Sequence, residues 1–247
     1  MLKYILVLSI STVCYAQELG FGCAGLIGGF GGYGVKFYNA RSLNQYVSVY
    51  NEIRRDSLSN SMGEFGVLRG YRVGLNLIRS GFENFEYTLK AYYEAFTETN
   101  KADVFGSDGI RTNSIELKMN TFGVGLELGG KISEAFSWKV LNFEVVYNNS
   151  ILFLSLQNQN VNLPREKLSS TNDSFGYNVG TGFILYIFKK YLSLEGQFGY
   201  SYFNIAGFEY PDGRLLNKNE LSIEPMVDPV SKGGFSALIQ LNLGFPL

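Results

Sequence analysis

Residues 175–187, FGYNVGTGFILYI, alternate bulky apolar side chains with glycine and asparagine. On a β-strand, residues two apart share a face, so this alternation predicts a strand with one apolar face and one small, polar face. The apolar face would carry Phe175, Tyr177, Val179, Thr181, Phe183, Leu185 and Ile187, and the opposite face Gly176, Asn178, Gly180 and Gly182.

The same period of two recurs along most of the chain. It is clear in FEYTLKAYYEA (85–95), LSLEGQFGYSY (192–202) and FSALIQLNLGF (235–245). Because this period is the main sequence signal of a half-buried strand, we predict an all-β protein. The predicted strands lie near residues 18–36, 63–79, 85–98, 114–131, 136–157, 174–188, 191–208 and 233–247.

Short and long links between these strands alternate strictly. The links after Arg79, Lys131 and Phe188 are tight, whereas those near 37–62, 99–113, 158–173 and 209–232 are long and polar. An up-and-down meander places all the short turns at one end and all the long loops at the other, which is typical of an outer-membrane barrel. We therefore predict an eight-stranded antiparallel barrel, a size at which side chains just fill the interior.

The composition narrows the class of protein. The 247-residue chain is 46% hydrophobic and 17% charged with a net charge of −1, so we expect no binding of nucleic acid. Residues 1–16 combine Lys3 with a short apolar run and small residues near Ala16, which predicts a cleaved export signal. The remaining 17–247 would form one barrel domain that keeps only Cys23, so no internal disulfide is expected.

The direction of the apolar face separates a membrane barrel from a soluble one. A secreted, lipocalin-like carrier would turn this face inward around an apolar ligand. A membrane barrel turns it outward, toward lipid. The second face holds glycine, serine, asparagine, glutamine and isolated charges, which suit a narrow polar lumen better than a solvated exterior. We predict the membrane barrel, with outer-membrane lipid against its apolar face, and keep the carrier as an alternative.

With these features the chain resembles the small eight-stranded outer-membrane barrels of Gram-negative bacteria, which include the OmpA transmembrane domain and the OmpX and OmpW families. The resemblance covers residues 17–247 and rests on strand pattern and loop order. It implies insertion by the barrel-assembly machinery. Such families often end on an aromatic residue, whereas this chain ends FPL, with Phe245 two places earlier.

The charged residues of the polar face are the candidate functional site. They could neutralise one another in a buried network, which costs less than leaving any one unpaired. They could also line a narrow channel for small solutes, and the filled interior of an eight-stranded barrel favours the network. The predicted members are Arg72, Glu86, Lys90, Glu94, Glu116, Lys118, Glu127, Glu144 and Glu195. Apolar positions switch from odd to even near Thr121 and Phe122, which predicts a β-bulge there.

The segment SLNQYVSVYNEIRRD (42–56) breaks the period of two. Ser42 and Gln45 match a capping box, so we predict a short amphipathic helix in the first long link. Its apolar stripe would consist of Leu43, Tyr46, Val47, Tyr50 and Ile53. We expect the stripe to pack over the barrel mouth. The alternative is a docking surface for a partner or for lipid head groups, with Arg54 and Arg55 on phosphates.

Aromatic residues near the predicted strand ends fit the interfacial girdles of membrane barrels. The girdle candidates are Phe136, Trp138, Tyr147, Tyr191 and Tyr202.

No catalytic or metal site is predicted. The outer-membrane barrel enzymes that this chain resembles in architecture use a histidine as a general base, and this chain has none. A Ser/Lys or paired-carboxylate mechanism stays open as an alternative, but no spacing singles out such a pair. One cysteine beyond the export signal leaves too few ligands for a transition metal, so we expect neither a metal nor another cofactor. The sequence thus favours a non-enzymatic outer-membrane barrel with a structural or interaction role through its long outside loops. A surface or periplasmic protein partner would remain to be identified.

Overall fold

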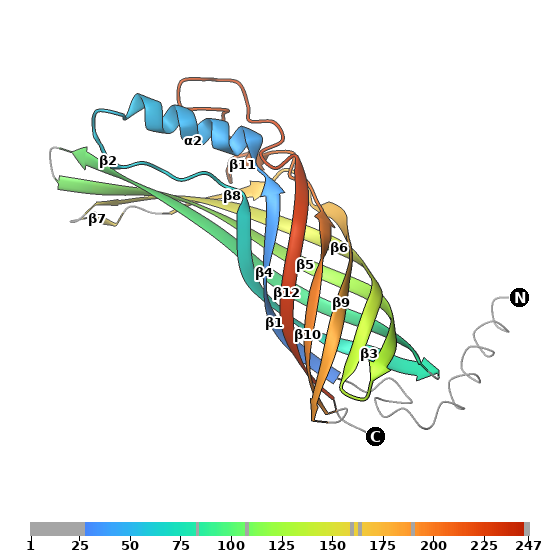
Figure 1. The fold of residues 1–247 in the computed structure, drawn as a ribbon. Coiled ribbons are helices and arrows are strands. Elements are labelled where there is room, and N and C mark those ends of the chain that lie inside the picture. Colours follow the sequence, from blue (N-terminus) through green and yellow to red (C-terminus); the bar gives the residue numbers. More distant parts are fainter. Residues whose placement is uncertain are drawn as a thin grey trace, which may run out of the picture.

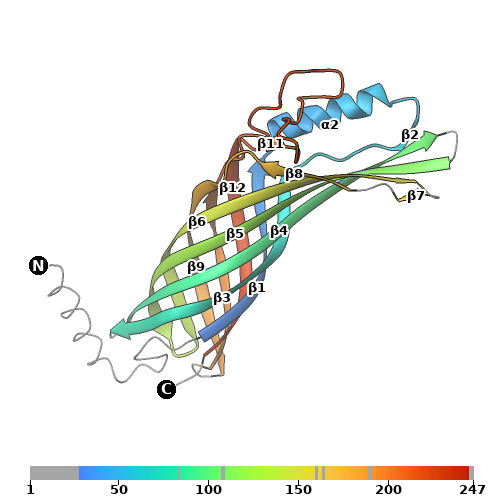
Figure 2. The same cartoon turned by 180° about the vertical axis from the view of Figure 1, so that it is seen from behind.

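The computed structural model describes residues 28–82, 84–106, 109–158, 161–162, 165–188 and 191–244. Eight antiparallel strands close into a barrel (Figures 1 and 2). Around the barrel they are β1 (Gly28–Asn39), β3 (Val67–Phe82), β4 (Phe85–Gly106), β5 (Gly109–Ser133), β6 (Phe136–Asn158), β9 (Ser174–Phe188), β10 (Leu192–Tyr202) and β12 (Lys232–Leu243). The pairing of β12 with β1 closes the ring, so each barrel strand has a neighbour on both edges.

The predicted fold class is confirmed, and each predicted strand overlaps one strand of the barrel. The predicted strand 191–208 is too long, because the chain leaves the barrel after Tyr202 and buries Phe203 and Ile205 above the mouth. The predicted export signal, 1–16, lies outside the described residues.

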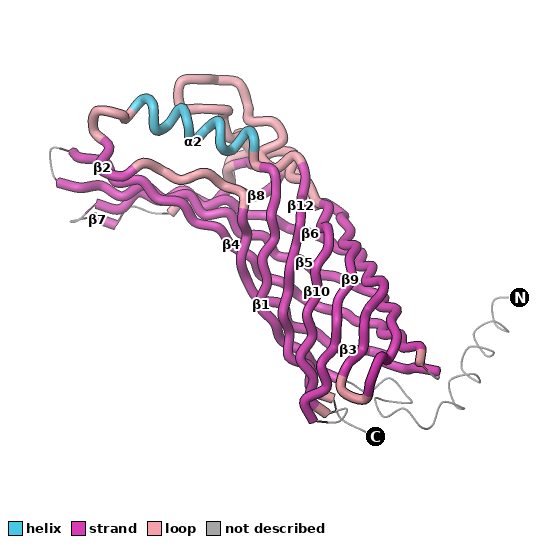
Figure 3. The backbone as a smooth tube through the Cα atoms, in the orientation of Figure 1, coloured by secondary structure: helices cyan, strands magenta, loops and turns pink. Residues whose placement is uncertain are grey.

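Three neighbouring strands are much longer than the rest. β4, β5 and β6 contain 22, 25 and 23 residues, whereas β1, β10 and β12 contain 12, 11 and 12. Figure 3 shows the three long strands continuing past the barrel to one side. We call residues 95–106, 109–120 and 149–158 the sheet extension. It is one uninterrupted piece with the barrel wall, because β4 and β5 pair without a register shift from Phe85 to Gly106.

The long links fold into a cap over the sheet extension and the barrel mouth. The cap consists of helix α2 (Arg41–Ile53) and residues 203–231. Short strands widen the sheet beneath it: β2 (Leu58–Asn60) pairs with β4, β8 (Glu166–Ser170) pairs with β6, and β11 (Phe208–Glu209) pairs with β8. A further short strand, β7 (Val161–Asn162), pairs with the end of β6. The cap has an apolar core of its own, in which Leu43 and Val47 of α2 meet Leu117 of β5 and Leu152 of β6.

Helix α2 is present where the sequence predicts it, with two differences. Its N-cap is Ala40, which makes no side-chain capping bond, so the predicted box of Ser42 and Gln45 is wrong and both residues lie within the first turns. Leu43, Val47 and Tyr50 are buried, and Tyr46 packs against the core, but Ile53 is 43% exposed. No helix among the described residues is long and apolar enough to cross a membrane.

The predicted bulge near Thr121 and Phe122 is wrong, because β5 pairs with both neighbours there without a shift. The environment changes instead. In the barrel, odd positions of β5 such as Glu127 face the polar lumen and even positions such as Val124 face outward. In the sheet extension, odd positions such as Leu117 face the cap core, and even positions such as Lys118 face outward. One unbroken strand therefore exchanges its apolar and polar faces at the barrel mouth.

This exchange predicts where a charge is tolerated on the outward face of β5. Leu126→Arg should lower the free energy of unfolding in lipid bilayers by about 2–4 kcal/mol, because Leu126 faces outward midway between Phe122 and Lys131, where an arginine would meet the bilayer midplane. Ser114→Arg, on the same face but in the sheet extension, should leave it unchanged. Urea titration of both variants in vesicles measures the difference, and equal effects would contradict the boundary between the two environments.

Candidate functional site

Charged side chains of alternating sign run through the lumen as one connected series, which we call the charge chain. From the cap end to the turn end its order is Lys36, Glu94, Arg72, Glu144, Lys90, Glu127, Lys139, Glu195 and Arg79. The Lys36–Glu94 and Arg72–Glu144 contacts are 2.5 and 2.8 Å long, and Lys90 lies 2.6 Å from both Glu127 and Glu144. Every carboxylate of the chain stands between two cations.

Burial makes this pairing necessary. All nine side chains are buried, and Lys90, Glu94 and Glu195 have no exposed surface. A charge in such a site is costly unless it has an opposite charge and hydrogen bonds. The alternating order meets this need with five cations and four carboxylates.

Neutral polar side chains satisfy the remaining oxygens of the carboxylates. Glu144 accepts hydrogen bonds from Tyr92 at 2.5 Å and from Asn178 of β9 at 2.7 Å. Glu195 accepts one from Asn242 of β12 at 3.1 Å. Together with the charge chain, these residues bring all eight barrel strands into one hydrogen-bonded lumen.

Glycines on the lumen face of β5 make room for these side chains. A Cβ on Gly123 would lie 2.3 Å from the Tyr92 ring, and one on Gly125 would lie 2.8 Å from Lys90 and 2.9 Å from Glu144. The sequence GVG at 123–125 therefore allows the aromatic ring and the two charges to cross the lumen at this level.

The structure brings together six of the nine residues that the sequence assigned to the lumen network: Arg72, Lys90, Glu94, Glu127, Glu144 and Glu195. Glu86 lies nearer the turns, half-buried, and accepts a hydrogen bond from Tyr186 at 3.1 Å. Glu116 and Lys118 do not belong to the lumen. They lie on the outward face of the sheet extension and pair with each other at 3.2 Å. The face exchange at the barrel mouth explains this error.

Sequence reasoning missed three cations of the charge chain. Arg79 and Lys139 are at odd positions, whereas their neighbours Arg72 and Glu144 are at even positions. Register shifts between Asn76 and Ile78, and between Lys139 and Asn142, change the phase and turn both side chains inward. Lys36 was missed for another reason. It lies on the same face as Gly32 and Gly34, and its position at the predicted strand end hid its orientation.

A small cavity lies beside the upper part of the charge chain. The cavity between Lys36, Arg72, Glu94 and Glu144 has a volume of about 30 Å³, which holds only a water molecule or two. Within the described ranges, no group of three or more His, Cys, Asp or Glu side chains could hold a metal ion. The arrangement is suited to fixing the strands relative to one another.

The cap core lies directly on the upper end of the charge chain. Lys36 Nζ is 4.9 Å from the centre of the Phe96 ring, and Phe96 is buried in the cap core. On the outer side of the cap, Arg54 of α2 pairs with Glu220 at 2.5 Å and ties the 203–231 segment to the helix. Burial, aided by the Glu220 carboxylate, raises the pKa of the Tyr46 phenol to about 12, so this side chain stays neutral at physiological pH.

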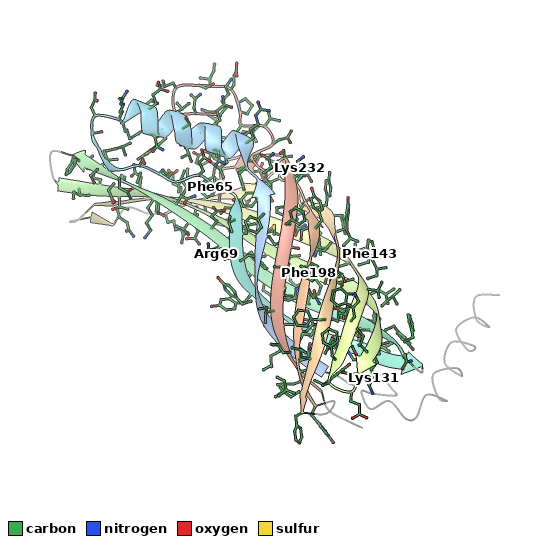
Figure 4. The ribbon with its side chains drawn as sticks, in the orientation of Figure 1. Phe65, Arg69, Lys131, Phe143, Phe198 and Lys232 are labelled. Atoms are coloured by element: carbon green, nitrogen blue, oxygen red, sulfur yellow. The ribbon has the colours of Figure 1, made fainter. Side chains whose placement is uncertain are left out.

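The outer surface of the barrel is apolar. Figure 4 shows Phe143 and Phe198 on it, between Lys131 near the turns and Lys232 beside the cap. A register row joins Tyr93, Phe122, Tyr147 and Phe175 on four neighbouring strands, and we call it the aromatic row. From Phe122 to Lys131, β5 runs for about ten residues, the length with which a tilted strand crosses a bilayer.

The predicted girdle residues lie on this outer surface. Tyr147 belongs to the aromatic row, and Tyr202 stacks on Tyr177 with ring centres 5.1 Å apart. Tyr191 and Phe136 lie at the turn end, and Trp138 contacts Phe198 edge-on, nearer to the turns than Tyr147. Charged side chains inside and apolar side chains outside are the distribution of a membrane-spanning barrel.

Removing one carboxylate should show how much the charge chain stabilises the barrel. Glu144→Gln leaves the buried Arg72 and Lys90 each short of a partner, so the free energy of unfolding should fall by about 3–5 kcal/mol. Glu116→Gln removes the more exposed pairs with Lys118 and Arg165, and should cost less than about 1 kcal/mol. Urea titration in vesicles measures the free energy of unfolding of both variants. Equal losses would show that the buried lumen pairs stabilise the barrel no more than the exposed pairs do.

No protein-family model matches the chain, and no curated protein matches it. Three solved structures are similar in fold. Neisserial surface protein A has 11% identity and a TM-score of 0.43, over 90% of this chain and 98% of its own. Ail, the attachment invasion locus protein of Yersinia pestis, has 12% identity and a TM-score of 0.40, over 89% and 97%. The outer membrane protease OmpT from Escherichia coli has 11% identity and a TM-score of 0.42, over 93% and 100%. At these identities and TM-scores the similarity carries no information about function.

Proposed function

We propose that the protein is an integral outer-membrane barrel that does not conduct solutes, has no enzymatic activity and presents the folded cap on the cell surface for interaction. The observation that carries this proposal is the charge chain. It fills the lumen of a barrel whose outer surface is apolar, and the cap core lies on its upper end.

The apolar outer surface supports the membrane location. Side chains such as Tyr71 and Phe175 are 68% and 75% exposed, which in water would be a large unfavourable apolar surface. The lipocalin-like carrier lacks support, because the lumen holds charges and the cavity beside Glu94 has room only for water. The export signal and insertion by the barrel-assembly machinery belong to the same proposal and would deliver the chain to the outer membrane.

The cap supports an interaction role rather than catalysis. It has a buried core of its own and carries exposed aliphatic side chains on the 203–231 segment, with Leu221 79% and Ile223 94% exposed. The chain has no histidine to act as a general base. A folded, ordered outer surface on a closed barrel is the arrangement of a binding platform.

Planar-bilayer recording of the refolded protein separates the closed barrel from the narrow channel. We expect no discrete conductance steps, because the nine charges of the chain pair across the lumen. Arg72→Ala with Glu144→Ala removes the central pair as a positive control and should produce steps if the recording can detect them. Steps in the unaltered protein would overturn the closed barrel and favour a solute channel.

A further inference from the structure

A pocket lies in the cap where the 203–231 segment passes beside α2 (Figure 1). Its volume is about 570 Å³, within the range of about 300–1,000 Å³ that is typical of ligand sites. Tyr46 of α2 contributes to the wall, and the other lining residues all lie between Tyr210 and Pro225. We call it the cap pocket. It is far larger than the water-sized cavity of the lumen and is separate from the charge chain.

A hairpin within the 203–231 segment gives the cap pocket a fixed shape. The Met226 N–H donates a hydrogen bond to the Leu216 carbonyl at 2.7 Å, and both side chains are buried in the cap core. Because successive residues of an extended chain point to opposite sides, the neighbouring Leu215 and Pro225 are turned outward and are exposed. A pocket that is already formed loses little conformational freedom when a ligand enters it.

The charged side chains at the cap pocket neutralise one another. Arg54 pairs with Glu220 at 2.5 Å, Arg214 with Asp212 at 2.7 Å, and Lys218 with Glu224 at 2.6 Å. Of these residues, Arg214 and Glu220 line the pocket directly. A charged ligand would have to compete with a pair that is already made. The pocket therefore favours an uncharged ligand.

Two phenol groups of the cap pocket are free to donate a hydrogen bond. Within the described part of the chain, neither the Tyr46 nor the Tyr210 hydroxyl makes a hydrogen bond. Both rings are half-buried, and this burial raises the pKa of both phenols, so both keep their proton at physiological pH. A hydroxyl shielded from water is stabilised by an acceptor. A carbonyl oxygen of a ligand would supply one.

The exposed part of the lining is largely aliphatic. Ile223 is 94% exposed and Leu215 45% exposed, and Pro225 lines the same pocket. Adjacent exposed apolar side chains gain free energy when an apolar group covers them. A saccharide carries hydroxyl groups around its ring, and this aliphatic side would leave them without partners. An uncharged peptide offers apolar side chains for this side and carbonyl oxygens for the phenols.

We propose that the cap pocket binds an uncharged, apolar stretch of a partner protein. One aliphatic side chain of the partner would lie against Ile223 and Leu215, and its main-chain carbonyls would accept hydrogen bonds from Tyr46 and Tyr210. The inference deepens the proposed interaction role of the cap and rests on it. The occupant is a peptide because paired charges, free donors and an aliphatic wall meet in one pocket.

A phage library of random peptides, selected on the whole protein in nanodiscs, tests the proposal. Empty nanodiscs first remove the peptides that bind lipid. We expect the enriched peptides to be uncharged and rich in leucine, isoleucine and valine, and their synthetic forms to bind with a saturable signal. Enrichment of charged peptides, or no enrichment above empty nanodiscs, would overturn the proposal.

Ile223→Ser and Leu221→Ser form a matched pair of variants. Both residues are exposed on the same segment, 94% and 79%, but only Ile223 lines the cap pocket. For a selected peptide, Ile223→Ser should raise the Kd by about tenfold, because an apolar contact is lost. Leu221→Ser should leave the Kd unchanged. Equal effects would show general adhesion to the segment and contradict binding in the pocket.

Removing the phenol groups tests the hydrogen bonds. Tyr46→Phe and Tyr210→Phe keep the rings and should each raise the Kd of a selected peptide by about fivefold. Tyr191→Phe, at the turn end of the barrel, is the control and should leave the Kd unchanged. An unchanged Kd in both pocket variants would exclude the two donors. Saturable binding of maltotriose that the same variants abolish would assign the pocket to saccharides and overturn the proposal.

The single tryptophan keeps failure of the cap pocket separate from failure of the barrel proposal. Trp138 lies on the outer barrel surface, so lipids brominated in their acyl chains should quench its fluorescence in every variant. Quenched Trp138 without any enriched peptide would overturn the cap pocket and leave the membrane barrel standing. Unquenched Trp138 would contradict the membrane insertion itself.

Discussion

The pairing of buried charges constrains this structure more than any other interaction. Four carboxylates in the lumen each need cations, and the cations come from strands far apart in the sequence. Glu144 of β6, for example, meets Arg72 of β3 and Lys90 of β4. An unpaired charge there would cost several kcal/mol, so the register of six strands is set by one requirement. The glycines on β5 and the bulges on β3 and β6 follow from it, because they bring the charged groups within contact distance.

A second constraint is the change of surroundings at the barrel mouth. Below it, the inside of the sheet is polar and the outside meets lipid. Above it, the inside meets the apolar core under α2, and the outside carries charges such as Lys118. A β-strand has only two faces, so β5 satisfies both environments by exchanging the residue types between them. β5 needs no register shift to do so, and the wall of the barrel continues as the floor of the cap.

The sequence was sufficient to predict the strands, their order, and a barrel with its polar face inside and its apolar face outside. The period of two is a local pattern, and the alternating link lengths give the order of the strands. The sequence was insufficient where a bulge or a change of environment decides which side chains of a strand point into the lumen. Glu116 and Lys118 looked like lumen residues because the apolar pattern changed near Thr121, and a sequence alone cannot tell a bulge from a change of environment. Arg79 and Lys139 were missed because real bulges at 77 and at 140–141 shifted their side chains inward. The apolar stripe of α2 was visible, whereas its partners in the cap core come from distant segments that contribute residues such as Phe65, Leu117, Leu152 and Phe208.

The unequal strand lengths give the molecule a direction in the plane of the membrane. A barrel that ends evenly looks alike from every side, but here three adjacent strands continue and five stop. The sheet extension of about 12 residues reaches about 40 Å from the barrel wall. Neighbouring molecules therefore meet a bare barrel on one flank and a broad overhang on the other. The orientation of the molecule about the membrane normal therefore decides which of the two flanks a neighbouring protein contacts.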